Sequence, residues 1–224
     1  MKITIINGSP RKNGATAKIL KKMQENFENI EDVTVSYHNL IDYSLLDCSG
    51  CMTCYARGVC HLKDNLEDIN NIVAESDALI IGSPVYVSNV PATLKKYIDR
   101  GHFVLEQSLH GKYAFAVSTY EIGGSSDVIS ILNKLFRMSG GIILGNLQIK
   151  LPFNSNPLSL PDMEQKLEKT SSRIYSSIKK KKGKKLMDKI INRIAIHYVI
   201  KPYANKRPKK YKAVFERWAK LKIV

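Results

Sequence analysis

Five apolar runs that alternate with helical patterns constrain the fold of this 224-residue chain more than any other feature of its sequence. The runs occupy residues 3–6, 33–37, 77–82, 113–119 and 141–151, and the last is interrupted near Gly145. Strands that alternate with helices form a mainly parallel sheet covered on both faces. Right-handed crossovers and a central first strand favour the strand order 2-1-3-4-5. We therefore expect an α/β fold of three layers.

The spacing of apolar residues predicts helices over residues 15–27, 64–75, 91–100 and 128–138, and a long helix that Asp162 caps. Asp64 and Glu67 have the spacing of a capping box at the start of the second helix. Residues 39–62 form one long loop in this interpretation. Loops of that length inside a compact domain are usually functional.

The first strand runs directly into a polar, glycine-bearing loop that ends at a helix. Such a junction gathers backbone N–H groups and a helix N-terminus at one point, which favours an anion such as phosphate. The loop is not a Walker motif, because no Gly-Lys-Ser or Gly-Lys-Thr follows. An ordinary strand-to-helix turn remains the alternative. The residues that we expect to bind the anion are Ser9, Arg11, Asn13, Gly14 and Thr16.

The loops after the third and fourth strands belong to the same edge of the expected sheet, where ligands of such folds bind. The first of them offers an aromatic face, although a loop tyrosine by itself is commonly just packing. The second offers small residues that let a flat ligand approach. One phosphate site, one ring and glycines suit a mononucleotide cofactor. The candidate residues are Pro84, Val85, Tyr86, Val87 and Ser88, with Thr119, Tyr120, Gly123 and Gly124.

All four cysteines, Cys48, Cys51, Cys54 and Cys60, lie within 13 residues. Disulfide frameworks distribute their cysteines to close loops, whereas clustered cysteines indicate metal or redox chemistry. The short spacing is typical of a [4Fe–4S] site, and glycines at 50 and 58 ease the tight wrapping. Zinc, or four thiols without metal, remain alternatives. His61 is interpreted as a solvated loop residue.

The net charge of +15 resides entirely in the last 46 residues. Residues 1–178 hold 18 basic and 18 acidic side chains, whereas residues 179–224 hold 17 basic and 2 acidic ones. Two apolar stripes at helical spacing predict helices in this basic extension: Leu186, Ile190, Ile194 and Tyr198, then Val214, Phe215, Trp218 and Leu221. Three interpretations stay open. The helices fold back on the core or on a neighbouring subunit, with an acidic redox partner as a variant, or they bind anionic lipid, or nucleic acid.

The sequence begins without a charged segment followed by an apolar one, so no secretory signal is visible. Its longest uncharged run, residues 78–94, is interrupted by Pro84 and Pro91 and is unsuited to crossing a membrane. We therefore expect a cytoplasmic protein.

Four segments together resemble the NADPH-dependent FMN reductase family of flavodoxin-like proteins. They are GSPRKNGAT (8–16), CSGCMTCYARGVC (48–60), SDALIIGSPVYVSNVPATLKKYIDR (76–100) and GKYAFAVSTYEIGG (111–124). The cysteine run resembles the iron–sulfur flavoprotein branch. The resemblance spans about residues 1–150 and departs from the usual pattern at Asn65 and Ser76, away from the expected chemistry. The extension from Lys179 matches nothing expected of the family.

The resemblance implies a flavodoxin-like fold that binds FMN without a covalent bond. The phosphate would lie in the loop 9–16, the ring edge against residues 84–88, and further ring support would come from residues 119–124. It also implies homodimers or tetramers. On this basis we divide the chain into an FMN-binding domain, residues 1–178, and a basic helical extension, residues 179–224.

The expected function is an FMN-dependent oxidoreductase that takes electrons from NADH or NADPH and passes them through a [4Fe–4S] cluster to a small-molecule or protein acceptor. No side chain is expected to act as an essential acid or base, because a flavin carries the chemistry itself. One alternative is a clusterless reductase of quinones, nitro compounds or free flavin. Another is a non-enzymatic flavodoxin-like module that its basic extension targets.

Overall fold

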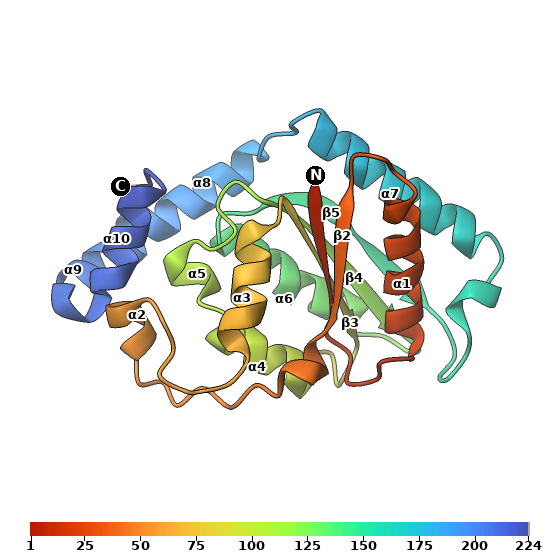
Figure 1. Cartoon of the computed structure of the whole chain (residues 1–224), viewed down its shortest axis with the longest axis horizontal. Helices are drawn as coiled ribbons and strands as arrows, with labels where there is room; N and C mark the ends of the chain where they lie inside the picture. The colour runs from red at the N-terminus through yellow and green to blue at the C-terminus, as the bar shows by residue number, and fades with distance from the viewer. Residues whose placement is uncertain (224) are drawn as a thin grey trace.

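The computed structural model describes residues 1–223 and has the expected parallel sheet at its centre (Figure 1). All paired strands run parallel, in the order β2-β1-β3-β4-β5, which confirms the predicted order. The strands are β1 (Lys2–Asn7), β2 (Thr34–Asn39), β3 (Ala78–Pro84), β4 (Tyr113–Tyr120) and β5 (Ile142–Lys150).

Helices cover both faces of the sheet and give it two apolar cores (Figure 1). On one face lie α1 (Ala15–Glu28) and α7 (Met163–Lys179). On the other lie α3 (Leu66–Glu75), α4 (Ala92–Arg100) and α6 (Ser125–Met138). Successive strand residues point to opposite faces, so Ile5 joins the first core and Ile6 the second. A sheet buried on both faces explains why its strands read as continuous apolar runs.

Several local expectations need correction. The stretch 39–62 is not one irregular loop, because it contains a 3₁₀ turn, Leu40–Tyr43, and a short helix, α2 (Thr53–Arg57). The predicted capping box is wrong, since α3 begins at Leu66 and the Asp64 carboxylate instead pairs with Arg100. Helix α6 begins three residues earlier than expected, because its polar first turn carries no apolar signal.

The last strand is irregular where the sequence indicated. Ala114 pairs with Ile143 but Phe115 pairs with Gly145, so Leu144 is an extra residue in β5. Gly145 has a φ of 141°, a backbone conformation that favours glycine. The bulge lies in the middle of the strand and leaves its carboxyl end aligned with β4.

The basic extension is helical, as predicted, and it bends in several places. It comprises α8 (Leu186–Ile194), a π-helix (Ala195–Ile200), α9 (Lys201–Asn205), a 3₁₀ turn (Pro208–Tyr211) and α10 (Lys212–Lys220). The π-helix precedes Pro202, which has no N–H to donate into a regular α-helix. Figure 1 shows α9 and α10 beside α2, at the end of the molecule farthest from α1.

The second apolar stripe of the extension packs inward, with Val214 and Trp218 buried, and the first does not. Val214 and Trp218 are fully buried and belong to a third apolar cluster. Leu186, Ile190, Ile194 and Tyr198 instead face outward. The extension does fold back on its own chain, through α8 on α6 and α10 on α2, but the first stripe is not the surface that packs there.

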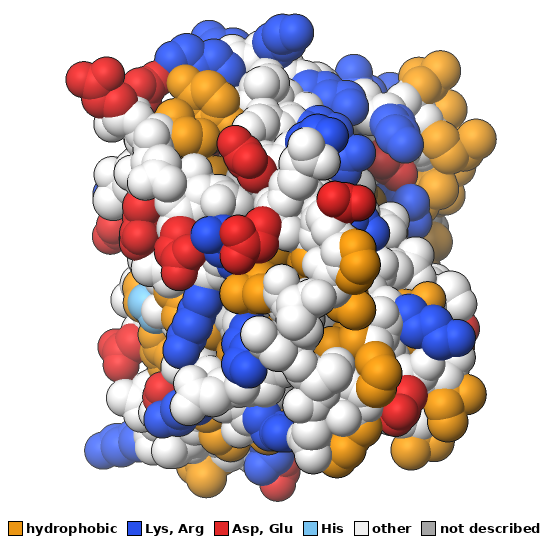
Figure 2. Space-filling model, turned by 90° about the vertical axis from the view of Figure 1, so that its right-hand side faces the viewer, with side chains coloured by type: hydrophobic (Ala, Val, Ile, Leu, Met, Phe, Trp, Pro, Cys, Tyr) orange, Lys and Arg blue, Asp and Glu red, His pale blue; other side chains and the backbone are white. Residues whose placement is uncertain are grey.

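Within residues 1–223 no helix is both long and apolar enough to cross a bilayer. Figure 2 shows the side of the molecule formed around α1 and α7, where basic, acidic and apolar side chains are interspersed.

Candidate functional site

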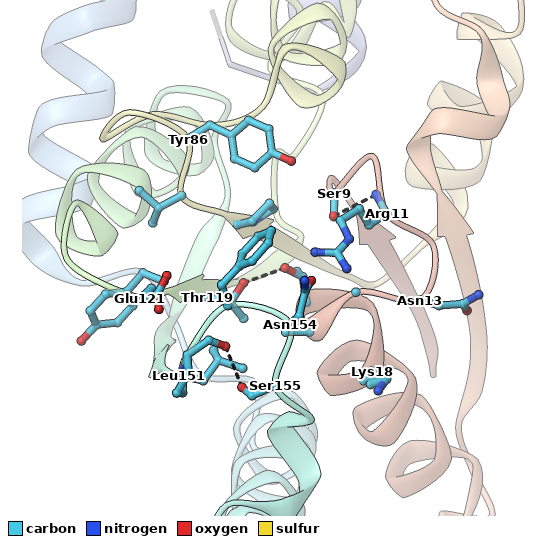
Figure 3. Close-up of a pocket in the computed structure, with 18 residues that line it drawn as sticks. Ser9, Arg11, Asn13, Lys18, Tyr86, Thr119, Glu121, Leu151, Asn154 and Ser155 are labelled. Carbon is cyan, nitrogen blue, oxygen red and sulfur yellow. Dashed lines mark hydrogen bonds between the residues drawn. The ribbon is translucent and has the colours of Figure 1, made fainter.

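Four strands end at one edge of the sheet, and the segments that follow them enclose a cavity (Figure 3). The cavity brings together most of the residues that the sequence nominated: Ser9, Arg11, Asn13, Gly14, Thr16, Pro84, Val85, Tyr86, Thr119 and Tyr120. The geometric expectation that these loops meet is correct. Its cause is the parallel sheet, which places all carboxyl ends at the same edge.

Hydrogen bonds within the loop after β1, and one to β3, hold that loop in place. Asn7 accepts the Ser9 N–H at 3.1 Å, and the Ser9 hydroxyl accepts the Arg11 N–H at 3.1 Å. Gly8 donates its N–H to the Gly82 carbonyl at 2.8 Å. A Cβ at Gly8 would lie 2.6 Å from the Leu94 side chain and 3.0 Å from the Gly82 carbonyl oxygen, so a larger residue there would have to displace Leu94. The loop is thereby fixed to β3 before any ligand binds.

The same loop offers unpaired donors at the start of α1. Within residues 1–223 the backbone N–H groups of Asn13, Ala15 and Thr16 have no hydrogen-bond acceptor. The first N–H groups of a helix have no partner inside the helix and attract anions. Arg11 and Lys18 line the cavity beside them and add positive charge. This donor set fits a phosphate group.

The side chain of Asn13 does not take part in that donor set. It points away from the cavity (Figure 3), and its carbonyl oxygen accepts a hydrogen bond from Lys21 at 3.3 Å. Its contribution to the cavity is its backbone.

The floor and one wall of the cavity come from β3 and β4. The Thr16 and Thr119 hydroxyls are 2.7 Å apart and connect α1 to β4. Tyr86 stands across the cavity from the first loop (Figure 3) and is half exposed. A flat ligand between these segments would have an aromatic neighbour and an open side toward solvent.

Val87, Ser88, Gly123 and Gly124 do not line the cavity. Tyr86 and Asn89 exchange backbone hydrogen bonds of 2.8 and 2.9 Å, which makes the two residues between them a tight turn. Val87 has a φ of 50° there and is fully exposed, an unfavourable conformation for a β-branched residue. A Cβ at Gly124 would lie 2.8 Å from the Ser88 hydroxyl and 2.9 Å from the Val85 side chain, so Gly124 packs closely against the loop that carries Tyr86.

A fourth segment of the cavity was missed at the sequence level. Residues 151–155 follow β5 and line the cavity with Ala15, Lys18 and Glu121. Phe153 is exposed, and its ring centre lies 5.4 Å from the Arg11 guanidinium. The available signal was topological, since the end of a fifth parallel strand belongs to the same edge.

A second cavity is lined by all four cysteines, together with Arg100 and His102 from the end of α4. The chain turns tightly around it, because Gly50, Met52 and Gly58 all have φ between 62° and 79°. The two glycines were expected to ease this wrapping, whereas Met52 was not singled out. All four cysteines are free thiols, and Cys48 and Cys51 are exposed.

Positive charge faces the thiols from α4. Arg100 donates to the Cys60 sulfur at 3.3 Å and is held by Asp64, with one Nη2–Oδ1 distance of 3.0 Å. Burial would raise the pKa of Asp64, but the Arg100 guanidinium and two backbone N–H groups hold it below its usual value. Asp99, next to Arg100, pairs separately with Lys95.

His102 adds a second cation beside the cysteines. Burial would lower the pKa of His102, but hydrogen bonds to Cys54 and Glu106 raise it to about 10. The Thr53 hydroxyl and nearby N–H groups lower the pKa of the Cys51 thiol. Thiolates are the metal-binding form of cysteine, so this environment fits an anionic metal–thiolate group.

Within residues 1–223 no three His, Cys, Asp or Glu side chains are gathered as ligands of one ion. All four cysteines nevertheless line one cavity.

The basic extension packs directly on the cysteine loop. The rings of Tyr55 in α2 and Tyr211 stack with centres 5.7 Å apart and planes 12° apart. The buried Trp218 indole donates to the Leu105 carbonyl at 2.7 Å. Met52 and Tyr55 complete the apolar cluster around Trp218. The extension thus supports one wall of the cysteine site, which its composition did not reveal.

The sheet has the flavodoxin-like strand order, and its cavity has donors suited to a phosphate, an aromatic wall and an open side. These features are typical of flavodoxin-like proteins that bind a mononucleotide. The family comparison is specific. The model of the NADPH-dependent FMN reductase family matches residues 1–155, and the chain belongs to this family. It is an FMN-dependent oxidoreductase by that membership.

Two individual relatives of this chain are both named iron-sulfur flavoproteins. An iron-sulfur flavoprotein of Clostridioides difficile is 40% identical over 226 aligned residues, which cover 100% of both chains. An iron-sulfur flavoprotein of Archaeoglobus fulgidus is 36% identical over 154 residues, which cover 65% of this chain and 66% of the relative. The basic extension is therefore included in the first match.

Solved structures share the fold at low identity. An NADH:FMN oxidoreductase in its apo form superposes with a TM-score of 0.56 at 20% identity, over 79% of this chain and 89% of that one. A flavodoxin from Archaea gives 0.54 at 14% identity, over 80% and 99%. These likenesses support the flavodoxin-like fold.

Proposed function

We propose that this protein is an iron–sulfur flavoprotein that takes electrons from NADH or NADPH at FMN and passes them to an acceptor through a [4Fe–4S] cluster. When bound, FMN accepts two electrons as hydride, and the cluster transfers electrons one at a time. One NAD(P)H would thus reduce two one-electron acceptors and release one proton.

The first cavity supplies the flavin site. The backbone N–H groups of Asn13, Ala15 and Thr16, with Arg11, would bind the phosphate. Tyr86 and residues 151–155 would flank the ring and limit its contact with water. The fixed loop after β1 supports this role, because a donor set formed before binding does not have to be ordered by the ligand.

The observation that supports the cluster most strongly is that four cysteines, and no other thiols, surround one cavity beside two cationic side chains. Cys48, Cys51, Cys54 and Cys60 would each bind one iron. Arg100 and His102 would offset the negative charge of the cluster, and hydrogen bonds to ligand sulfurs tune its potential. The names of the two iron-sulfur flavoprotein relatives support the same proposal.

Replacement of one ligand separates the two cofactors. Cys54→Ser should bind FMN with wild-type affinity but retain little iron after anaerobic reconstitution, because it removes one of the four thiolates that would bind the irons. FMN is measured by its absorbance after release, and iron and sulfide by colorimetric assay. Ser108→Ala is the control, because Ser108 lines neither of the two cavities, and this variant should keep both cofactors.

Wild-type iron content in Cys54→Ser would show that this ligand assignment is wrong. A wild-type protein that binds FMN but never iron would favour the clusterless reductase of quinones, nitro compounds or free flavin.

We also infer an assembly of two or four chains, which the family resemblance supports, and a reducing compartment, which four free thiols support. Light scattering tests the first inference. A single chain at working concentration would contradict it.

A further inference from the structure

Helix α8 packs on the body of the protein with its polar side. Asp188 is buried and pairs with Arg137 of α6. One turn later Asn192 donates to the Gln107 side chain at 3.2 Å and to the Arg137 carbonyl at 3.1 Å. Ile196, a further turn on, enters the third apolar cluster. Residues at this spacing share one helix face, so the docking side of α8 is set by hydrogen bonds and charge.

The opposite side of the same helix is apolar and exposed. Ile190 and Ile194 are 44% and 49% exposed, and Leu186 and Tyr198 are 73% and 77% exposed. A surface helix ordinarily turns its apolar stripe toward the core. Here the orientation is reversed, and contiguous exposed apolar surface marks a site of interaction.

The exposed stripe is long and continuous. Helix α8, the π-helix and α9 together cover residues 186–205 without a break. Twenty helical residues span about 30 Å. In Figure 1 this segment follows the outer boundary of the molecule, from α8 at the upper left to α9 at the left-hand end. The exposed apolar side chains therefore lie along one continuous helical segment.

Basic side chains surround the stripe without acidic ones between them. Lys185, Lys189 and Arg193 are exposed along the flank of α8. From residue 179 to residue 211 the only acidic side chain is Asp188, which is buried. A helix with an apolar face and lysines beside it lies in the interface of an anionic membrane.

The charge distribution favours lipid over a second copy. A twofold interface would bring the same face of two chains together. Both faces would carry unbalanced lysine and arginine rows, and like charges that face each other oppose association. Anionic headgroups have the complementary sign.

We propose that residues 186–205 dock this protein onto an anionic lipid surface, with Leu186, Ile190, Ile194 and Tyr198 entering the headgroup region. The cavity at the carboxyl edge of the sheet then stays accessible from water. This inference does not depend on either cofactor.

Flotation with vesicles tests the proposal on the full-length protein. Vesicles of phosphatidylcholine with about a third phosphatidylglycerol should bind it, and vesicles of phosphatidylcholine alone should not. Raising the salt from about 0.1 M to about 0.5 M should weaken binding, because salt screens the basic flank. Failure to bind the anionic vesicles at low salt would overturn the proposal.

A matched pair of variants locates the contact. Ile190→Asp should weaken binding by about tenfold, because it removes an apolar side chain that would enter the headgroup region and adds a charge that anionic lipid repels. Ile41→Asp makes the same change at a similarly exposed isoleucine, 38% against 44%, and should leave binding within about twofold. Circular dichroism checks that both variants fold, and Ile194→Ser serves as a milder substitute if Ile190→Asp does not.

If nucleic acid or a second copy of the chain covered this stripe instead of lipid, the same experiments would give different results. Equal vesicle binding by wild type and Ile190→Asp would reduce the contact to charge alone, as for nucleic acid, and would overturn the proposal. A dimer in light scattering that Ile190→Asp dissociates, without vesicle binding by wild type, would identify a second copy as the occupant.

Discussion

At the residue scale, one buried ion pair joins the end of α4 to the cysteine loop. The Arg100 and Asp64 side chains are 1% and 5% exposed, and Arg100 also reaches the Leu46 carbonyl and the Cys60 sulfur. Removing one partner of such a pair leaves a buried charge uncompensated. The pair therefore matters more than the exposed pairs of this protein.

Asp64→Asn should lower the free energy of unfolding by about 3 kcal/mol, measured by urea denaturation at pH 7 on the metal-free protein. Asp99→Asn is the matched control, because Asp99 pairs with Lys95 on the exposed side of the same helix. That change should cost less than about 0.5 kcal/mol. Equal effects of the two variants would show that burial does not strengthen the Arg100–Asp64 pair.

The pH dependence of this difference has a definite sign. The pKa of Asp64 is lowered from 3.8 in the folded protein, so the ionised form stabilises the fold. Its contribution is fully present above pH 3.8 and is lost as the pH falls through the lower folded value. The gap between wild type and Asp64→Asn should stay constant at neutral pH and close below about pH 4.

Single residues also show where sequence reasoning succeeds. Ser9, Arg11, Thr16 and Thr119 could be nominated because strand ends and loop composition are local features. The partner of Asp64 could not, because Arg100 is 36 residues away and a capping box was the nearest local explanation. The orientation of the stripe on α8 stayed open for a similar reason, since periodicity gives the faces of a helix but not which one is buried.

At the element scale, α2 depends on the extension for its position. It has five residues, and isolated helices of that length are not stable. Tyr55 of α2 stacks on Tyr211, and such a pair contributes about 0.5–1.5 kcal/mol beyond the area that it buries. The extension should therefore order the loop that carries the cysteines.

Tyr211→Ala should expose the bond after Arg57 to trypsin and increase its cleavage rate by about fivefold, because about 1 kcal/mol of stacking is lost. Tyr211→Phe keeps the ring and should restore the wild-type rate. Tyr198→Ala is the control on the exposed side of the extension. Gel electrophoresis and mass spectrometry follow the cleavage, and an unchanged rate in Tyr211→Ala would refute this role for the extension.

At the scale of the whole molecule, the fold was predictable and the relation between its parts was not. Alternating strands and helices, with right-handed crossovers, leave few topologies, and the strand order follows from them. The segment 151–155 and the contact between α10 and α2 depend on how distant segments meet in space. No local pattern encodes either one.

The molecule thus combines two cavities with different chemistry. One has backbone donors, Arg11 and an aromatic wall at the carboxyl edge of the sheet. The other has four cysteines next to Arg100 and His102 and is supported by the basic extension. We propose that the first cavity binds FMN and that the second cavity of the same chain binds a [4Fe–4S] cluster.

Cofactor content of the anaerobically purified and reconstituted protein tests that claim most directly. We expect one FMN, four iron and four sulfide per chain, with iron–sulfur absorbance beneath the flavin bands. FMN with neither iron nor sulfide after reconstitution would contradict the second site, and a protein that binds no FMN would contradict the first.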